Sequence, residues 1–466
     1  MKKIAIAGGG ISGLTVAYAL INANQDLEVT VFEADNRAGG KIWSDRTDGY
    51  LCEKGANGFL DNKPRTLELC KSLGIDPVRS NENSKKRFIF SGGRLKELPE
   101  SPLSFIKSDL LSWSGKLRLL LELNAPKGPP DETVADFIIR RLGREALEKL
   151  IDPMVSGIYA GDPYRMSIKN CFPRIKELEQ EYGSLIRAMI KLRKAGKTKS
   201  KECRQQSSGS APQKVSAAPG GTLTSFYNGA QTITDALAER LGSCLNTGVS
   251  VHGIAKENNS YKLYTSKETV DADIVILASP AYASADILKD FDGELSKVLS
   301  SIPYPHVSVV CFGYGKAEVT HPLTGFGFLT PHIENRNILG TLWDSSIFPN
   351  RASDGHVLLR TMIGGAQSPG IATLDDGKLT DIVFNELKSI VGLKTEPEMV
   401  SVYRWDRAIP QYILGHSRIL NAIDERLGHY PGLYLTGNAY RGIGINDCVE
   451  NSYRLAEEIM KMSPDI

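Results

Sequence analysis

Residues 3–13, KIAIAGGGISG, join a short apolar segment to three glycines, Gly8, Gly10 and Gly13. The apolar segment has the composition of a buried strand, and the residues after Gly10 have that of a helix. An acidic residue, Glu33, follows twenty residues after Gly13 at the end of a second apolar segment. This order of strand, glycines, helix, strand and acid predicts a dinucleotide-binding βαβ unit.

Each of these residues has a separate task in such a unit. Gly8 gives the turn its freedom in φ, Gly10 lets backbone NH groups approach a pyrophosphate, and Gly13 lets the helix pack on the sheet. The free NH groups and positive dipole end of the helix would hold the phosphates. Because Glu33 can accept hydrogen bonds from ribose hydroxyls and would repel a 2′-phosphate, we expect FAD or NAD rather than NADP. The predicted cofactor contacts in this turn are Gly8, Gly10, Ile11, Ser12 and Gly13.

Length and composition exclude several classes of protein. The chain has 466 residues, of which 41% are hydrophobic and 24% charged, which is typical of globular proteins of up to about three domains. Its net charge of +2 argues against a nucleic-acid-binding protein that works through bulk charge. The seven cysteines form no CxxC pair, which argues against structural zinc, and their odd number favours a reducing compartment. We expect no bound metal, because the histidines are also dispersed.

No segment has the features of an exported or membrane-spanning chain. The apolar stretch after the N-terminal lysines is too short for a secretory signal. None reaches the roughly 18 uncharged apolar residues of a spanning helix. We therefore expect a cytoplasmic protein that is soluble or lies on a membrane surface.

The order of predicted elements indicates an α/β protein whose cofactor domain is built from separated pieces. A helix from Lys63 to Leu73, the strand DIVILA near residue 275 and the strand GLYLTGN near residue 435 extend the opening unit. Short apolar runs with Gly and Pro between residues 295 and 415 are typical of an antiparallel sheet. The predicted domains are a cofactor domain (1–80, 220–290 and 420–466), a sheet domain (81–100 and 291–419) and a helical domain (101–219).

The helical segment carries two features with open interpretations. Its apolar residues include Trp113 and Leu117 on one helical face, which predicts either a helix packed on a core or a face resting on a bilayer. That face consists of Leu110, Trp113, Leu117, Leu120 and Leu121. Residues 191–204 carry seven bases and one acid, and we interpret residues 191–219 as a mobile surface loop first and an anionic-lipid contact second.

Two glycine-rich segments add to the opening motif. In residues 33–41, EADNRAGGK, Arg37 can reach a phosphate or a flavin, and the glycine pair lets the backbone approach the cofactor. Residues 437–448, GNAYRGIGINDC, pass from a strand into a helix, so that the NH groups of Ile443, Gly444 and Ile445 can face a phosphate or flavin O2.

These segments resemble a known family over essentially the whole chain. The chain looks like the oxygen-dependent protoporphyrinogen oxidases of the flavin amine-oxidase superfamily in four motifs. These are ExxxRxGGK, GNxYxGIGxNDC, SGIYAGDPYRMS at 156–167 and GFGFLTP at 325–331. The resemblance implies a Rossmann-like FAD domain of the p-hydroxybenzoate-hydroxylase type, a mixed-sheet substrate domain and a helical membrane-associating domain. It implies six-electron oxidation of protoporphyrinogen IX by O2, with H2O2 as product, in haem biosynthesis.

The resemblance also implies roles for individual residues. Matches to non-covalent FAD contacts are Gly8, Gly10, Gly13, Glu33, Arg37, Gly40, Lys41, Val251, Gly444 and Ile445. Matches to porphyrinogen contacts are Arg87 with a propionate, Gly161 with a pyrrole NH, and Leu329 and Met362 on either side of a pyrrole ring. Some members carry a second arginine where Asn57 stands, so a propionate contact there is not expected. No protein side chain is assigned a catalytic role, because the flavin would carry the reaction.

Three other functions stay open at this stage. The first is oxidation of coproporphyrinogen III by the same chemistry, and the second is another oxidase or desaturase of the superfamily. The third is a non-catalytic FAD-binding or membrane-scaffold protein. A peripheral contact with the cytoplasmic membrane and a homodimer are also expected, whereas a nucleic-acid partner is not.

Overall fold

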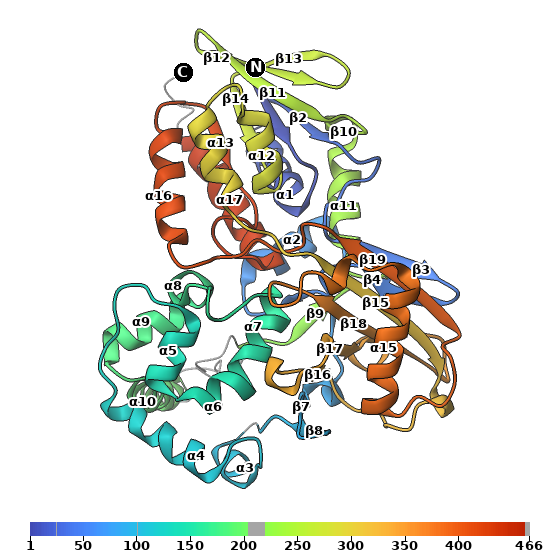
Figure 1. Ribbon diagram of the computed structural model, residues 1–466. Helices are drawn as coiled ribbons and strands as arrows, with labels where there is room; N and C mark the ends of the chain where they lie inside the picture. The colour runs from blue at the N-terminus through green and yellow to red at the C-terminus, as the bar shows by residue number, and fades with distance from the viewer. Residues whose placement is uncertain (25, 100, 204–219, 462–466) are drawn as a thin grey trace.

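The computed structural model describes residues 1–461, apart from residues 25, 100 and 204–219. Figure 1 shows a parallel sheet with its helices at the top, a second sheet at the lower right and a group of helices at the lower left. In the part that is described, no helix is long and apolar enough to cross a membrane.

A five-stranded parallel sheet forms the core of the upper unit, in the order β10-β2-β1-β14-β20. Ile4 of the central strand lies opposite Val29 on one side and Ile274 on the other. Alternate residues of this strand point to opposite faces, Ile4 and Ile6 to one and Ala5 and Ala7 to the other. The strands are Lys2–Ala7 (β1), Leu27–Glu33 (β2), Leu245–Thr247 (β10), Ile274–Leu277 (β14) and Leu433–Leu435 (β20).

Helices cover both faces of this sheet, which explains why β14 (IVIL) and residues 4–7 of β1 are continuous apolar runs. One face packs against α1 (Ile11–Ala23), α2 (Pro64–Leu73), α11 (Thr232–Leu241) and α17 (Ile445–Lys461). The other face packs against α12 (Ala281–Leu288), α13 (Gly293–Ser300), α16 (His416–Leu427) and a small antiparallel sheet of β11 (Val251–Glu257), β12 (Ser260–Thr265) and β13 (Thr269–Ala272).

A seven-stranded mixed sheet forms the second unit, in the order β19-β15-β18-β17-β16-β7-β8. Only β16 and β7 pair in parallel, so the sheet is mixed, as predicted. Helix α15 (Asp376–Val391) covers one face, and the antiparallel pair of β3 (Ser44–Thr47) and β4 (Tyr50–Glu53) packs on the other. The strands are Phe88–Ser91 (β7), Arg94–Glu97 (β8), Val307–Gly315 (β15), Gly327–Leu329 (β16), Ile338–Trp343 (β17), His356–Gly364 (β18) and Met399–Trp405 (β19).

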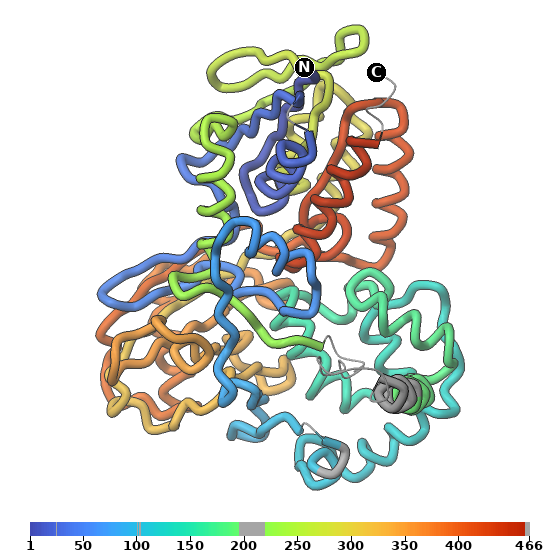
Figure 2. Tube along the Cα trace, turned by 180° about the vertical axis from the view of Figure 1, so that it is seen from behind, coloured from blue at the N-terminus to red at the C-terminus, as the bar shows by residue number. Residues whose placement is uncertain are grey.

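The two sheets are joined by several chain passages. Seen from behind, the chain after α2 descends from the parallel sheet to β7 and β8 (Figure 2). On this path β6 (Val78–Arg79) joins a three-stranded sheet with β5 (Phe59–Leu60), which precedes α2, and β9 (Leu223–Ser225), which lies between them. Strand β4 belongs to the segment that follows β2 of the parallel sheet, and it packs on the mixed sheet.

The third unit consists of helices, as its apolar pattern predicted. The first interpretation was that the apolar face of helix α4 packs on a core. The structure exposes this face instead, with Trp113, Leu117, Leu120 and Leu121 being 71, 63, 62 and 57% exposed. Only Leu110, which precedes α4, is buried. The helices are Pro102–Lys107 (α3), Trp113–Leu120 (α4), Val134–Arg141 (α5), Arg144–Ala146 (α6), Asp152–Tyr159 (α7), Ile168–Cys171 (α8), Pro173–Tyr182 (α9) and Leu185–Cys203 (α10).

The orientation of α4 is set by its glycine. A Cβ at Gly115 would lie 2.0 Å from Oε2 of Glu145, and the NH of Ser112 donates to Oε1 of the same residue at 2.8 Å. The glycine side of the helix therefore faces the protein, and the leucine side faces outward. The prediction that these leucines pack on a core is wrong for this reason.

The prediction of a loop from residue 191 is also wrong, because residues 191–203 continue α10. Lys, Arg, Ala and Leu favour helix, and this outweighs the glycine and serine in the segment. Glu122 also supports the start of α10, since its carboxylate accepts from the NH groups of Leu185 at 2.7 Å and Ile186 at 3.1 Å. Residues 204–219 of the predicted loop lie outside the described residues.

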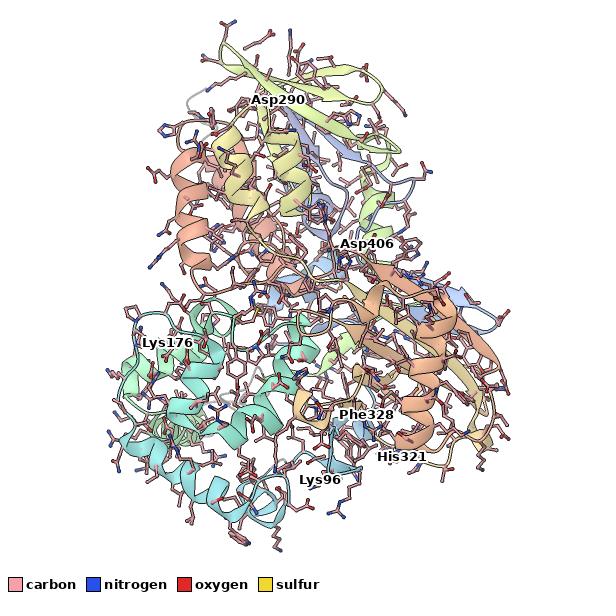
Figure 3. All side chains as sticks on the ribbon, in the orientation of Figure 1. Lys96, Lys176, Asp290, His321, Phe328 and Asp406 are labelled. Atoms are coloured by element: carbon pink, nitrogen blue, oxygen red, sulfur yellow. The ribbon has the colours of Figure 1, made fainter. Side chains whose placement is uncertain are left out.

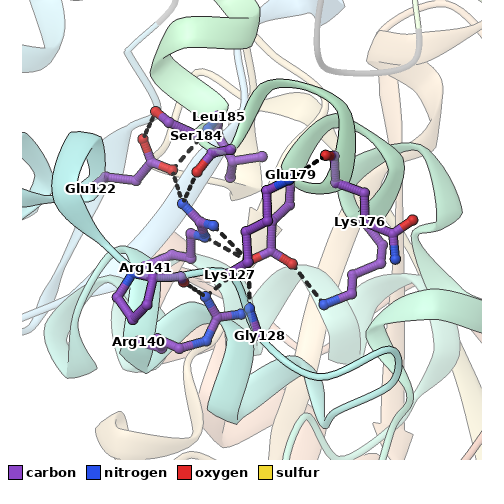
Figure 4. Close-up of polar contacts among 12 residues, drawn as sticks. Glu122, Lys127, Gly128, Arg140, Arg141, Lys176, Glu179, Ser184 and Leu185 are labelled. Carbon is purple, nitrogen blue, oxygen red and sulfur yellow. Dashed lines mark hydrogen bonds and ion pairs between the residues drawn. The ribbon is translucent and has the colours of Figure 1, made fainter.

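A network of buried charges fixes α10 to the other helices (Figure 4). Arg141 is fully buried and donates to Glu122 at 2.9 Å and to Glu179 at 2.8 Å. Burial alone would raise the pKa of Glu179, but hydrogen bonds from Lys176, Arg141 and Arg140 outweigh it and lower that pKa to about 2. The network holds equal numbers of acids and bases, namely Glu122, Glu132, Glu179, Arg140, Arg141 and Lys176.

We expect Glu122→Gln to lower the free energy of unfolding by about 3 kcal/mol, because it removes one partner of a buried ion pair. The matched control is Glu148→Gln, which breaks a 3.7 Å ion pair with the exposed Arg144 and should cost about 0–1 kcal/mol. Denaturant unfolding followed by circular dichroism measures both. Equal losses would show that the buried network adds no stability.

Candidate active site

The turn between β1 and α1 has the predicted glycine geometry. Gly8 has a φ of 114°, and its NH donates to the carbonyl of Phe32 at 2.8 Å. A Cβ at Gly13 would lie 1.9 Å from the carbonyl oxygen of Gly8, so the helix can approach the strand only without a side chain there. A Cβ at Gly10 would meet nothing closer than the Cα of Gly40, at 4.0 Å. Gly8 and Gly13 therefore shape the turn, and Gly10 leaves open space beside it.

That open space lies at the start of two helices. No side chain caps the first turn of α1 at Gly10, so its first NH groups are available to an anion. Helix α17 begins nearby, because the thiol of Cys448 in its first turn is hydrogen-bonded with Ser12, and further along the helix the hydroxyl of Ser452 donates to the carbonyl of Ser12 at 3.0 Å. Ile11 and Ser12, both predicted contacts, lie in the first turn of α1.

Glu33 ends β2 beside this turn. Its carboxylate accepts from the NH groups of Gly9 at 2.7 Å and of Asp35 at 2.9 Å. Burial raises the pKa of Glu33, and these two hydrogen bonds oppose the rise. Val249 donates its NH to the backbone carbonyl of Glu33 at 2.8 Å, and the predicted contact Val251 follows two residues later at the start of β11. A carboxylate keeps acceptor sites for ribose hydroxyls in this arrangement.

The loop of residues 37–41 is bound mainly by the protein itself. Arg37 donates to the carbonyls of Ala38, at 2.8 Å, and Gly40, and its guanidinium lies 4.0 Å from the ring centre of Trp43. Its Nε is buried and has no partner among the described residues. The ammonium of Lys41 donates to the carbonyls of residues 407 and 408, and burial lowers the pKa of Lys41 to about 8. Arg37 keeps its Nε–H for a ligand, and the Lys41 ammonium, which has three N–H groups, keeps one beyond those bonded to the two carbonyls.

The C-terminal glycine turn is also partly satisfied within the protein. The NH of Gly444 donates to Oδ2 of Asp447 at 3.2 Å, and Oδ1 of Asp447 lies 2.6 Å from the ammonium of Lys63. Ile445 is buried in the core of the parallel sheet. The carboxylate of Asp447 thus occupies one of the three NH groups that we expected to face a ligand.

Two of the predicted substrate residues lie along the mixed sheet. Leu329 of β16 lies opposite Gly340 of β17, which lies opposite Met362 of β18. Paired residues of neighbouring strands share a face, and this row continues to Val309, which packs with Tyr50 of β4. Leu329 and Met362 are half-buried, with a glycine between them.

Arg87 and Gly161 border this row. Arg87 is exposed, directly precedes β7, and has no carboxylate partner among the described residues. Its guanidinium lies 5.3 Å from the ring centre of Phe326. Gly161 follows α7, and the neighbouring carbonyl of Ala160 accepts from the NH of Ala366 at 2.7 Å, just beyond β18. The structure thus brings all four predicted substrate residues to one part of the mixed sheet.

Several residues of the site were not selected from the sequence. Gly157 of α7 packs so closely that a Cβ there would lie 2.8 Å from a methyl group of Leu329. Gly340 and Gly157 could have been noticed, because glycine inside an apolar strand or helix often marks a close approach. The side-chain amide of Asn57 is also notable, since both its polar atoms are buried without a partner among the described residues.

These features fit a dinucleotide cofactor with a polar ring system. The open space at Gly10 and the uncapped helix suit a pyrophosphate, and Glu33 suits a ribose. The free donor of Arg37 and the amide of Asn57 lie on the segments between the parallel sheet and the mixed sheet. In the described part of the chain, no group of three or more His, Cys, Asp or Glu residues could hold a metal.

Comparisons with known proteins show what the whole chain is similar to. Residues 11–460 match the family model for flavin containing amine oxidoreductases. The chain is 35% identical to the chloroplastic protoporphyrinogen oxidase of Oryza sativa subsp. japonica, over 97% of this chain and 87% of that protein. It is 32% identical to the coproporphyrinogen III oxidase of Bacillus subtilis (strain 168), over 96% of each. A crystal structure of a protein from Exiguobacterium sp. 255-15 has 27% identity, a TM-score of 0.83 and 99% coverage of both chains. The resemblance indicated by the motifs is confirmed.

We expect Gly10→Val to raise the dissociation constant of FAD by at least about 10-fold, because its side chain would enter the open space and displace charge-assisted hydrogen bonds of about 1.5–3 kcal/mol each. The apoprotein should keep its melting temperature. Gly13→Ala is the contrasting variant, since its Cβ would meet a carbonyl oxygen at 1.9 Å and should lower that melting temperature. Flavin absorbance after dialysis and thermal unfolding test the pair. Full flavin retention by Gly10→Val would contradict the assignment.

Proposed function

The chain belongs to the flavin containing amine oxidoreductases, and from this membership we propose that it oxidises protoporphyrinogen IX to protoporphyrin IX with O2, a step of haem biosynthesis. The observation that carries the proposal is the row of Leu329, Gly340 and Met362, with an unpaired arginine at its edge. The balanced reaction removes six electrons and six protons from the substrate and reduces three O2 to three H2O2. Similar relatives with this name support the proposal.

FAD is the cofactor that this site fits. The uncapped start of α1 would hold its pyrophosphate, Glu33 its ribose, and Arg37 and Asn57 the polar edge of its ring. Bound there, FAD would supply a two-electron acceptor that O2 can regenerate. A covalent link is not expected, because Cys448 is buried against α1 and burial raises its pKa to about 11.

The substrate side would recognise a flat, largely apolar ring with acidic substituents. Leu329 and Met362 offer apolar contacts, and Gly340 between them leaves room for a ring to lie flat on the sheet. Arg87 would pair with a propionate, and its planar guanidinium suits a carboxylate. The role of the protein is to orient the ring and exclude water, with no acid or base assigned to proton transfer.

Oxidation of coproporphyrinogen III is the second candidate. The relative from B. subtilis with that name is matched over 96% of both chains. Coproporphyrinogen carries more propionates than protoporphyrinogen. A site for it should offer more cations than the single unpaired arginine that the described residues place at the edge of the row. We therefore rank protoporphyrinogen first.

Anaerobic stopped-flow mixing of the yellow holoprotein with each porphyrinogen tests this choice. We expect protoporphyrinogen IX to bleach the flavin faster than coproporphyrinogen III, with peroxide formed on admission of air. Faster bleaching by coproporphyrinogen III would establish the second candidate. No bleaching by either would refute both.

We expect Arg87→Ala to raise KM for the porphyrinogen by about 10-fold to 100-fold, as for the loss of a charge-assisted bond of about 1.5–3 kcal/mol, with kcat nearly unchanged. Arg94→Ala is the control, because Arg94 is exposed on the adjacent β8 but is ion-paired with Asp109. An unchanged KM in Arg87→Ala would make Arg87 a surface residue only.

We propose a peripheral contact with the cytoplasmic membrane through the α3–α4 surface, defined as Ile106, Trp113, Leu117, Leu120 and Leu121. All five side chains are more than half exposed, and the ammonium of Lys116 lies 4.6 Å from the ring centre of Trp113. Exposed Trp and Leu with a neighbouring base suit the interface of an anionic bilayer. A cytoplasmic location and a homodimer remain predictions.

We expect the double variant Trp113→Asp, Leu117→Asp to lose most of its binding to sedimented vesicles of anionic phospholipid, because charged groups oppose insertion. The control is Tyr264→Asp, since Tyr264 is a similarly exposed residue on β12 at the opposite end of the molecule (Figure 1). Equal sedimentation of both variants would place the contact elsewhere.

A further inference from the structure

Two neighbouring buried residues, Gln411 and Tyr412, contact both of the loops that carry the candidate site. They follow β19 on a segment that runs between the two sheets, where Figure 3 labels the nearby Asp406. Neither residue is among the predicted contacts of FAD or porphyrinogen. Their side chains contact different loops. Tyr412 contacts the loop of residues 437–445, called here the flavin loop, and Gln411 contacts the loop of residues 159–167, called here the substrate loop.

The hydroxyl of Tyr412 closes the flavin loop. It donates to the carbonyl of Asn438 at 2.7 Å and accepts from the NH of Gly442 at 2.9 Å. Gly442 has a φ of 97°, and a Cβ there would lie 2.5 Å from the Cβ of Asp447, so this turn has little freedom to adopt another shape. The hydroxyl thus fixes the backbone just before Gly444.

The ring of Tyr412 is held by a stacked histidine. The rings of Tyr412 and His416 lie 4.3 Å apart with an angle of 18° between their planes. His416 is fully buried, and burial lowers its pKa to about 4, so that it is neutral at pH 7. A neutral stacked ring restricts Tyr412 without adding a charge beside the flavin loop.

Gln411 and the backbone of Tyr412 hold the substrate loop. The side-chain amide of Gln411 donates to the carbonyl of Tyr159 at 2.8 Å, and its Oε1 lies 2.8 Å from where a Cβ of Gly161 would stand. The carbonyl of Tyr412 accepts from the NH of Ser167 at 2.8 Å. One short rigid segment therefore touches the chain on both sides of Gly161.

We propose that Gln411 and Tyr412 are positioning residues that set the place of Gly161 relative to the Gly442–Ile445 turn. The inference rests on the proposed function and on two roles predicted from the sequence, a contact of Gly161 with the porphyrinogen and a place for the turn near the flavin. Because the two side chains reach different loops, their loss has different effects. Tyr412 acts on the flavin side, and Gln411 acts on the substrate side.

Tyr412→Phe keeps the stacked ring and removes both hydroxyl hydrogen bonds. We expect the dissociation constant of FAD from the apoprotein to rise about 10-fold, as for the loss of two net hydrogen bonds. The maximal rate of anaerobic flavin bleaching should fall, with the half-saturating porphyrinogen concentration unchanged. Gln411→Met should show the reverse, an approximately 10-fold rise of that concentration with unchanged affinity for FAD.

The control is Tyr261→Phe, which also removes a buried tyrosine hydroxyl bonded to a carbonyl, that of Pro431 at 2.9 Å. It should lower the melting temperature about as much as Tyr412→Phe and leave all three constants unchanged. The proposal is overturned if Tyr412→Phe binds FAD like Tyr261→Phe, or if both site variants change all constants together. Should Tyr412→Phe fail to fold, the constants of Gln411→Met decide the test.

The titration with FAD needs no porphyrinogen, so it separates this inference from the proposed function. If neither porphyrinogen bleaches the wild-type holoprotein, the proposed function fails. A weakened affinity for FAD in Tyr412→Phe alone would still support the positioning role on the flavin side, and an unchanged affinity would refute it.

Discussion

The site depends on one close approach, that of Gly13 to the carbonyl of Gly8. A Cβ at Gly13 would lie 1.9 Å from that oxygen, so only glycine lets α1 start directly at the end of β1. This approach directs the first turn of α1 toward the carboxyl edge of the sheet, where parallel strands present their ligands. Glu33, the 37–41 loop and the start of α17 are all arranged around that edge. Without this approach, these segments would not meet at one edge of the sheet.

Local patterns were sufficient to predict the opening unit and an antiparallel sheet, whereas the one parallel pair of that sheet, β16 with β7, was implied only by the family resemblance. Strand β1, helix α2 with its stop at Gly74, and strand β14 lie within a few residues of their predicted bounds, because each is defined by its own composition. The exposed face of α4 could not be predicted in the same way. Which side of an amphipathic helix is buried depends on a partner distant in sequence, here Glu145 against Gly115.

The same limit applies to the residues of the site. The motifs predicted Arg37 and Lys41 as cofactor contacts, but not the carbonyls that bind them, which for Lys41 come from residues 407 and 408. The motif also did not show that the NH of Gly444 donates to Asp447, whose short side chain lies in the first turn of a helix. Motif matching therefore indicated where the site lies, and only tertiary contacts show which donors remain for a ligand.

The discontinuous parallel sheet also determines when the site can form during synthesis. Strands β1 and β2 leave the ribosome first, but β14 begins at Ile274, β20 at Leu433 and α17 at Ile445. Until then β1 has an unpaired edge, and one face of α1 lacks the helix that covers it. Exposed edges and apolar faces are sites of aggregation in nascent chains. The chain should therefore need protection by chaperones over most of its translation, and it can load flavin stably only once α17 has docked.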